Sequence, residues 1–382
     1  MNTLLPPFRE LLERLIALPS VSSADGRLDM SNRRVIHLLA GWLGDLGFRV
    51  EEKALAGDKA NLVAVLGGGP GGLVLAGHTD TVPWDDALWT SDPFRLAERN
   101  GRFYGLGTSD MKAFFAVALE ALRDVREQDL THPVIVLATA DEETSMAGAK
   151  ALTGYPLLHN RAAVIGEPTA LKPVRMHKGM MMEAIRVVGR SGHSSDPALG
   201  NNALEGMQRV MGALLRWRGE LQAAHREPLF KVPHPTLNLG HIHGGDNPNR
   251  ICGQCELHID LRPTPGLGVD ALRREMQQRV ADALAGSGLE LVFEPLFDGI
   301  PAFATDGAAA IVKAAEEFSR APAEAAAFAT EAPYLSALGT PTVVLGPGDI
   351  RQAHQPDEYL AMENVTPMVD ILRGLVRCFC MT

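Results

Sequence analysis

Short unbroken runs of apolar residues alternate with helical patterns over the first half of the chain. Four of these runs are typical of β-strands buried on both faces: 61–66, 73–76, 134–139 and 162–165. Three segments carry apolar residues at helical spacing: 8–18, 33–46 and 111–125. A further buried strand at 341–345 and a helix at 364–378 follow near the end of the chain. This alternation predicts an α/β fold in which a mixed sheet is flanked by helices.

The middle of the chain follows a different pattern. Apolar and polar residues alternate over 180–189 and 255–261, as in antiparallel strands with one solvated face. Two helices and a third strand are expected at 202–217, 269–285 and 289–295. The sequence therefore predicts a discontinuous α/β domain, residues 1–176 and 297–382, with an inserted α+β domain, residues 177–296.

The composition narrows the class of protein. The chain has 382 residues, of which 46% are apolar and 21% charged, so a core can form without disulfides. No apolar run reaches the roughly 18 residues of a membrane helix, and the N-terminus lacks the features of a signal peptide. With only four cysteines, these features predict a cytoplasmic protein without a membrane partner. The net charge of −10 argues against nucleic acid as a partner.

Two motifs that resemble functional sites are interpreted as structural. The glycine-rich segment 67–72 has no following lysine and precedes a strand, so a tight turn is expected rather than a phosphate-binding loop. The C-x-x-C pair, Cys252 and Cys255, leads into a predicted strand and has no second pair at zinc-finger spacing. These cysteines are therefore predicted to be structural.

Side chains that bind metals follow four predicted strands. They are His78 and Asp80, Glu142 and Glu143, Glu167, and His354, while Asp110 precedes a predicted helix. Taken alone, each of these residues has an ordinary structural role instead of metal binding: a hydrogen bond in a loop, a place in the first turn of a helix, or a helix N-cap. Ligands bind outside the carboxyl ends of strands in α/β sheets, and converging N and O donors suit a binuclear zinc-type centre. The shared pattern favours the metal centre over coincidence.

The spacing within two of these pairs predicts different roles for the two members of each pair. His78 and Asp80 are two residues apart and face the same way on an extended backbone, so the Asp80 carboxylate is expected to hold the imidazole. Glu142 and Glu143 are adjacent and need not face the same way. One of them can bind a metal while the other stays free as a general base.

Six motifs in this order identify a resemblance to a known superfamily: HTDTVP, GLGTSDMK, DEETSMAGA, GEPT, GHSSDP and HQPDEY. Together they resemble the metallo-aminoacylase and carboxypeptidase superfamily of binuclear zinc hydrolases, over nearly the whole chain. The resemblance implies a zinc-peptidase-like catalytic domain with an inserted lid and dimerisation domain. It also implies two divalent metal ions, zinc or alternatively cobalt, and a homodimer formed through the lid domain.

The resemblance assigns roles to individual residues. His78 and Glu167 would hold one metal, Glu143 and His354 the other, and Asp110 would bridge them. One departure is visible next to the bridging residue. Ala113 stands where the superfamily generally has glycine, and little effect is expected because the carboxylate is intact.

Four further residues receive roles in catalysis or substrate binding from the same resemblance. Asp80 would orient His78, and Glu142 would be the general base. His193 in the GHSS motif would reach a partner subunit's active site and polarise the scissile carbonyl. Arg250 would grip the substrate carboxylate, which a guanidinium can do with two hydrogen bonds.

The implied activity is hydrolysis of an N-acyl amino acid, in particular release of acetate from N2-acetyl-L-ornithine. Two sister activities stay open: desuccinylation of succinyl-diaminopimelate and general N-acyl-amino-acid hydrolysis. The motif TEAPYL at 330–335 argues against both, because those relatives tend to carry an SD-type motif there. An alternative of another class is a non-catalytic metal- or peptide-binding protein on the same fold.

Overall fold

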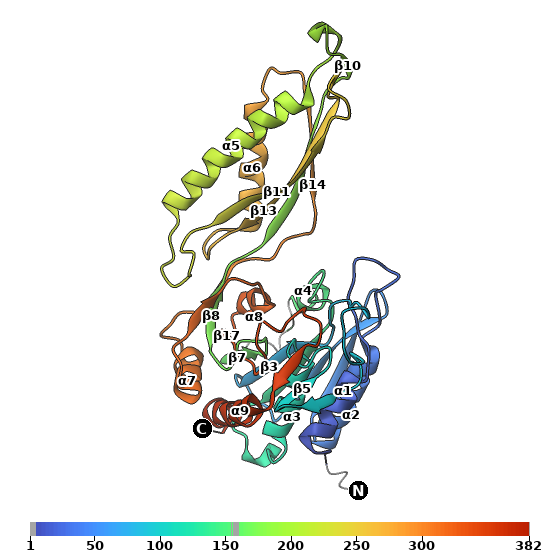
Figure 1. The fold of residues 1–382 in the computed structure, drawn as a ribbon. Helices are drawn as coiled ribbons and strands as arrows, with labels where there is room; N and C mark the ends of the chain where they lie inside the picture. The colour runs from blue at the N-terminus through green and yellow to red at the C-terminus, as the bar shows by residue number, and fades with distance from the viewer. Residues whose placement is uncertain (1–4, 154, 156–159, 382) are drawn as a thin grey trace. The chain divides into compact units, whose positions relative to one another are not determined.

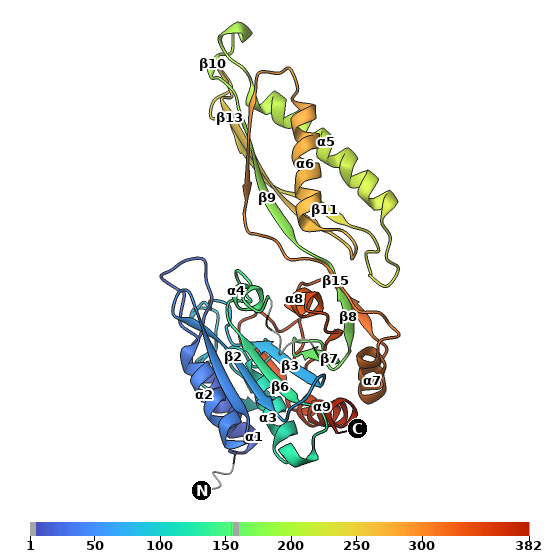
Figure 2. The same ribbon diagram turned by 180° about the vertical axis from the view of Figure 1, so that it is seen from behind.

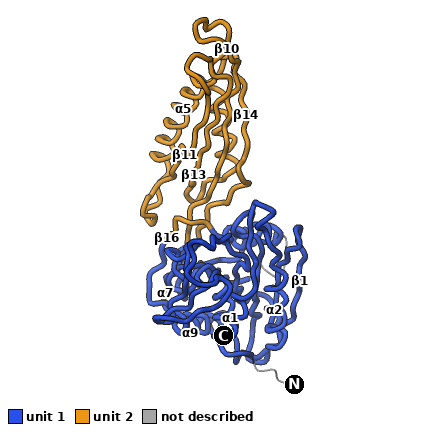
Figure 3. The backbone as a smooth tube through the Cα atoms, turned by 45° about the vertical axis from the view of Figure 1, so that its right-hand side comes forward, with its two compact units in different colours: residues 1–175, 305–324, 330–382 blue, residues 176–304, 325–329 orange. Residues whose placement is uncertain are grey.

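The computed structural model describes residues 5–153, 155 and 160–381. The chain divides into two compact units, which Figure 3 shows in different colours. Unit 1 comprises residues 1–175, 305–324 and 330–382, and unit 2 comprises residues 176–304 and 325–329.

The boundary after unit 2 lies later in the chain than the joint predicted at 296/297. Residues up to Ala304 group with unit 2. Ile300 forms an antiparallel bridge with Met180, and strand β15 (Phe303–Ala304) pairs with residues Met176 and His177. These backbone hydrogen bonds hold the returning segment beside the outgoing one, which a hydrophobic pattern along the sequence does not reveal.

Unit 1 is built on a mixed sheet of strand order β1-β2-β6-β3-β7-β17-β8 (Figures 1 and 2). The strands are β1 (Arg49–Leu55), β2 (Lys59–Leu66), β3 (Leu73–His78), β6 (Val134–Thr139), β7 (Ala162–Ile165), β8 (Val174–His177) and β17 (Thr342–Val344). The four neighbours β6, β3, β7 and β17 run parallel to one another. The antiparallel strands β1 and β2 complete one side. The predicted mixed α/β fold is confirmed.

Helices pack against this sheet and against one another. Those of unit 1 are α1 (Phe8–Ile16), α2 (Arg33–Asp45), α3 (Lys112–Leu122), α4 (Ala147–Lys150), α7 (Ala310–Ser319), α8 (Ala332–Ala337) and α9 (Val365–Cys380). Helix α3 contacts α1, α2, α9 and strand β3, and ten of its eleven residues are buried. Such a helix, apolar on all sides, belongs in the interior. Among the described residues, no helix has the length and apolar character needed to cross a bilayer.

The glycine-rich segment joins two strands that are not neighbours. Strand β6 lies between β2 and β3, so the segment crosses the start of β6 instead of forming a tight hairpin turn. A Cβ atom at Gly72 would lie 2.0 Å from the carbonyl oxygen of Pro133, and Gly72 has a φ of +101°. Only glycine fits this close crossing without strain.

Unit 2 contains an antiparallel sheet of strand order β11-β13-β9-β14. Its main elements are β9 (Met181–Val188), β11 (Thr236–Gly244), β13 (Gln254–Arg262), β14 (Glu290–Pro295), α5 (Ala203–Ala224) and α6 (Val269–Ala283). Helices α5 and α6 contact each other, and α5 contacts β9, β11 and β13 (Figure 2). Buried residues alternate with partly exposed ones along β13, as the alternating sequence predicts. A two-stranded sheet pairs β10 (Gly192–His193) with β12 (Arg250–Ile251).

Candidate metal centre

Four adjacent parallel strands of unit 1 carry the candidate ligands to one edge of the sheet. His78 is the last residue of β3, and Glu142 and Glu143 follow β6. Glu167 follows β7, and His354 lies in the loop after β17. Parallel strands have their carboxyl ends at the same edge. Strand order alone therefore brings residues from distant parts of the chain together.

The ligand atoms form two groups that share one carboxylate. In the first, His78 Nε2 lies 3.1 Å from Asp110 Oδ1 and 3.9 Å from Glu167 Oε2. In the second, His354 Nε2 lies 3.0 Å from Glu143 Oε2 and 3.6 Å from Asp110 Oδ2. Each oxygen of Asp110 thus faces a different histidine. Glu142 joins the first group, with ligand atoms of His78, Glu142 and Glu167 within 4.8 Å of one another.

The electrostatics of this cluster fit bound cations. Burial raises the pKa of Glu142 and of Glu167 well above the usual value. The charge of Glu167 adds to this shift at Glu142, and the charge of Asp110 adds to it at Glu167. Burial and the charge of Asp110 likewise raise the pKa of Glu143. Glu167 Oε1 is buried and has no hydrogen-bond partner among the described residues. Crowded buried carboxylates with an unused acceptor are the donor set that divalent metal ions bind.

The same negative charges raise the pKa values of the two histidines, because they favour the protonated imidazole. Burial lowers the pKa of His78, but the hydrogen bond with Asp110 and the charge of Glu167 raise it well above its usual value. The hydrogen bond with Glu143 raises the pKa of His354 to about 9. His354 also adopts a φ of +59°, a strained backbone conformation that often marks functional residues. Both imidazoles thus occupy a strongly negative pocket, which a divalent metal ion would neutralise.

The carboxylate of Asp80 makes a different contact from the one expected. Nδ1 of His78 lies 3.0 Å from the backbone carbonyl oxygen of Asp80 but 3.7 Å from its carboxylate oxygen Oδ1. Oδ2 of Asp80 instead accepts the backbone N–H of Glu143 at 3.1 Å. Asp80 therefore contacts His78 through its main chain and Glu143 through its side chain.

A buried lysine supports the turn that carries Glu142 and was not found from the sequence. Lys59 Nζ lies 2.8 Å from carboxylate oxygens of both Asp29 and Asp141. Asp141 has a φ of +57° and also accepts a hydrogen bond from Ser22 Oγ at 2.9 Å. These partners come from distant positions, so no local motif could have identified them.

Another buried carboxylate, Glu331, lies at the carboxyl end of β6. Its Oε2 accepts a hydrogen bond from Thr139 Oγ1 at 2.8 Å, and burial raises its pKa to about 7. Glu331 is part of the TEAPYL motif. From the sequence, this motif distinguishes related activities, and its glutamate receives no role.

The two remaining predicted site residues, His193 and Arg250, belong to unit 2. They face each other as a register pair of β10 and β12. Nδ1 of His193 lies 2.7 Å from Ser195 Oγ, and Arg250 forms an ion pair with Asp246 at 2.5 Å. Both side chains are exposed. The structure brings these residues to one another, and their roles toward substrate stay predictions.

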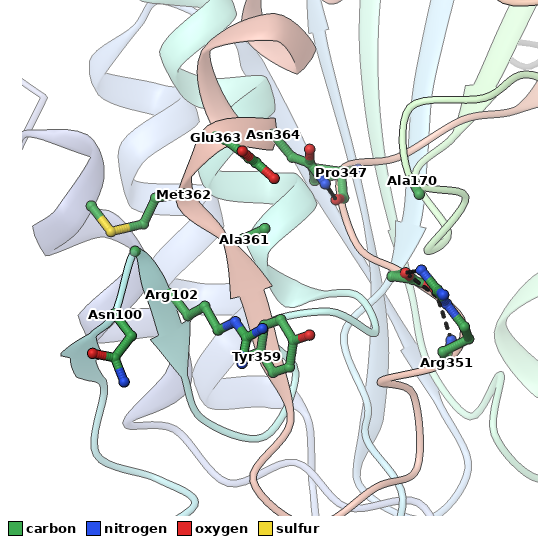
Figure 4. Close-up of a pocket in the computed structure, with 12 residues that line it drawn as sticks. Asn100, Arg102, Ala170, Pro347, Arg351, Tyr359, Ala361, Met362, Glu363 and Asn364 are labelled. Carbon is green, nitrogen blue, oxygen red and sulfur yellow. Dashed lines mark hydrogen bonds and ion pairs between the residues drawn. The ribbon is translucent and has the colours of Figure 1, made fainter.

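A cavity of about 600 Å³ in unit 1 is lined by other residues. Its wall includes Arg102, whose guanidinium lies 4.1 Å from the ring centroid of Tyr359, together with Arg351 and Glu363 (Figure 4). Arg351 forms an ion pair with Asp349. None of the predicted metal ligands lines this cavity.

Comparison with known proteins defines the class to which this fold and cluster belong. Residues 74–377 match the family described as Peptidase family M20/M25/M40. The chain belongs to this family and is a hydrolytic enzyme with a candidate metal site. The superfamily resemblance identified from the motifs is thereby confirmed.

Individual proteins and solved structures are similar to this chain over nearly its whole length. Acetylornithine deacetylase from Edwardsiella ictaluri (strain 93-146) is 51% identical over 382 residues, covering 100% of both chains. A solved tripeptidase from Staphylococcus aureus subsp. aureus Mu50 has a TM-score of 0.76 at 20% identity, covering 97% of each chain. The Bacillus subtilis YXEP protein, a dinuclear metal binding peptidase of the M20 family, has a TM-score of 0.67 at 16% identity. That comparison covers 97% of this chain and 96% of that one.

Proposed function

We propose that this chain hydrolyses N2-acetyl-L-ornithine to L-ornithine and acetate, a step that supplies ornithine for arginine synthesis. The observation that carries the chemistry is the position of Asp110, whose two oxygens face His78 and His354. The full-length similarity to an acetylornithine deacetylase supports the substrate. The test is a comparison of kcat/KM for N2-acetyl-L-ornithine, succinyl-diaminopimelate and N-acetylmethionine. A preference for either of the other two compounds would keep the chemistry and reject the substrate.

Five residues would hold two divalent ions. His78 and Glu167 would bind one, Glu143 and His354 the other, and Asp110 would bridge them. Zinc suits this set of N and O donors, and cobalt is an alternative. When bound, the ions supply Lewis-acid polarisation of the scissile acyl group.

Glu142 would act as the general base. Its carboxylate is close to His78 and Glu167, and burial together with the charge of Glu167 raises its pKa, the direction expected of a carboxyl group that accepts and donates a proton in catalysis. In this role it accepts a proton from the attacking water as oxygen bonds to the acyl carbon. It then donates that proton to the amide nitrogen as the C–N bond breaks, which yields acetate and the free amine.

Three other residues would orient the reacting groups. Asp80 holds the backbone of Glu143 through its carboxylate and Nδ1 of His78 through its carbonyl oxygen. Arg250 would bind the substrate carboxylate with two parallel hydrogen bonds. His193 would reach the active site of a partner subunit. There it would donate a hydrogen bond to the oxyanion that forms on the acyl oxygen.

Unit 2 would form a homodimer. Strand β11 is an edge strand of its sheet, and an apolar groove beside it is lined by Leu204, Leu215 and Ile242. All three side chains are exposed, and a second copy of the chain is the occupant we propose. Light scattering after gel filtration measures the mass directly, and Ile242→Asp is expected to convert the dimer to a monomer.

The low cysteine content also supports a cytoplasmic protein.

A further inference from the structure

The loop that carries Asp110 is held by a carboxylate from the other end of the chain, Glu358. We propose that Glu358 is a positioning residue, which fixes the bridging carboxylate of Asp110 between the two metal sites. This inference rests on the proposed function, because it concerns the geometry of the metal centre described there. It adds a residue that is not among the candidate metal ligands.

Three backbone N–H groups of one loop converge on the side chain of Glu358. Oε1 accepts the N–H groups of Ser109 at 2.6 Å and Asp110 at 2.9 Å. Oε2 accepts the N–H of Gly107 at 3.1 Å. Successive N–H groups that point inward form an anion-binding concavity. Here the anion is supplied by the chain itself, and Glu358 is only 1% exposed.

The main chain of Glu358 strengthens the same attachment. Its carbonyl oxygen accepts the N–H of Gly105 at 3.0 Å and the hydroxyl of Thr108 at 3.3 Å. Glu358 thus binds the loop through its side-chain carboxylate and through its backbone carbonyl group. Because these bonds include the N–H of Asp110 itself, a shift of the Glu358 carboxylate must move the backbone from which the bridging side chain projects.

A second pair of bonds joins the loops of Asp110 and His354. Ser109 Oγ accepts the N–H of Asp349 at 2.9 Å and lies 3.2 Å from the carbonyl oxygen of the same residue. His354 lies between Asp349 and Glu358 in sequence. The segment that supplies His354 is therefore tied to the Asp110 loop on both sides of the histidine. This arrangement sets the distance between the Asp110 loop and His354, one of the two histidines that the Asp110 carboxylate faces.

The side chain of Lys112 supplies a positive charge close to Glu358. Lys112 is buried, and its Nζ donates a hydrogen bond to the carbonyl oxygen of Leu18 at 2.9 Å. Glu358 and Asp80 are the two carboxylates whose charges act on it. Both carboxylate oxygens of Glu358 therefore have backbone donors, and Lys112 is the basic side chain whose charge acts on this carboxyl group.

The experiment titrates zinc into metal-free, full-length protein by calorimetry. Glu358→Gln keeps the side-chain volume but turns one oxygen into a donor that faces backbone N–H groups. Loss of a residue that orients ligands typically weakens metal binding about 10- to 100-fold, and we expect a loss of this size in at least one site. We also expect kcat to fall more than KM changes.

A control variant and a stability measurement separate positioning from a general structural role. Glu363→Gln alters an exposed carboxylate five positions further on and should leave zinc affinity unchanged. A purely structural role would lower the Tm of the metal-free protein and leave zinc affinity unchanged in the folded variant, which would overturn the proposal. Should Glu358→Gln fail to fold, Glu358→Asp is judged by the same criterion, since it keeps the charge but withdraws it from the loop.

The wild-type titration separates this inference from the function on which it rests. A wild-type chain that binds no zinc contradicts the proposed function and this inference together. A wild-type chain that binds two ions, with a folded Glu358 variant of equal affinity at both sites, contradicts the positioning role alone.

Discussion

Nε2 of His78 lies 3.1 Å from Oδ1 of Asp110. The histidine ends strand β3, and the aspartate ends the loop that leads into helix α3. Helix α3 packs directly against β3. The packing of these two core elements therefore positions the backbone from which each of the two side chains projects. In the proposed role, a carboxylate that bridges from this position would make the two metal sites interdependent, and the first prediction tests that dependence.

Removal of the shared carboxylate should affect both metals, whereas removal of one histidine should affect mainly one. We expect Asp110→Ala to bind neither ion tightly and His354→Ala to retain one. The measurement is metal content after dialysis against a limiting zinc buffer. Asp124→Ala, an exposed aspartate, is the matched control and should retain two. Two tightly held ions in Asp110→Ala would exclude the bridging role.

The neighbouring glutamates should separate metal binding from proton transfer. Glu142→Ala is expected to keep its metal and to lose turnover by about 10²- to 10⁴-fold, the usual contribution of a general base. Glu143→Ala, one residue on, is expected to lose metal as well as turnover. Metal content and kcat are measured on the same preparations. Turnover of Glu142→Ala near the wild-type level would remove Glu142 from the mechanism.

A buried histidine outside the metal centre should make stability depend on pH. Burial lowers the pKa of His177 to about 4 in the folded chain, whereas the unfolded value is about 6.5. The unfolded state therefore binds more protons between pH 6.5 and 4, and stability falls as the pH falls through this window. At pH 5 the loss relative to pH 7 is about 2 kcal/mol.

Urea unfolding of metal-free protein at pH 7 and pH 5 measures this effect. The wild type should lose about 2 kcal/mol more between the two pH values than His177→Phe, which has no titrating ring. Other titrating groups are common to both proteins and cancel in the comparison. An identical loss in both proteins would show that His177 does not carry the dependence.

Loss of the buried cation at position 59 should destabilise unit 1. Lys59→Met removes the partner of Asp29 and Asp141, and breaking a buried ion pair costs about 3 kcal/mol or more. Lys53→Met is the control, because Lys53 is partly exposed and pairs with the partly exposed Glu51. Its effect should stay within about 0.5 kcal/mol. Equal denaturation midpoints for the two variants would contradict the assigned role of Lys59.

Much of the sheet could be predicted because its strands are buried on both faces. The runs 134–139 and 162–165 coincide with β6 and β7, since a fully buried strand needs uninterrupted apolar residues. Strand β11 was missed. It is an edge strand, and exposed side chains such as His241 and His243 interrupt its apolar pattern. Its structure depends on pairing with β13, which no local signal encodes.

The convergence of four candidate ligands could be predicted for the same topological reason, whereas the contacts of their supports could not. His78, Glu143, Glu167 and His354 end or follow neighbouring parallel strands, which brings them to one edge, whereas Asp110 precedes helix α3. Lys59 and Glu358 act through partners that are distant in sequence, Lys59 on Asp141 and Glu358 on the loop of Asp110. The contact of Asp80 with the backbone of Glu143 likewise depends on how two loops fold against each other.

Ornithine release from N2-acetyl-L-ornithine by the purified chain tests metal-dependent deacetylation most directly. The assay is run on untreated protein, after removal of metal with EDTA, and again after zinc or cobalt is restored. Turnover should disappear with the metal and return with either ion. Release that persists in metal-free protein, or its absence from protein with two bound ions, would exclude metal-dependent deacetylation.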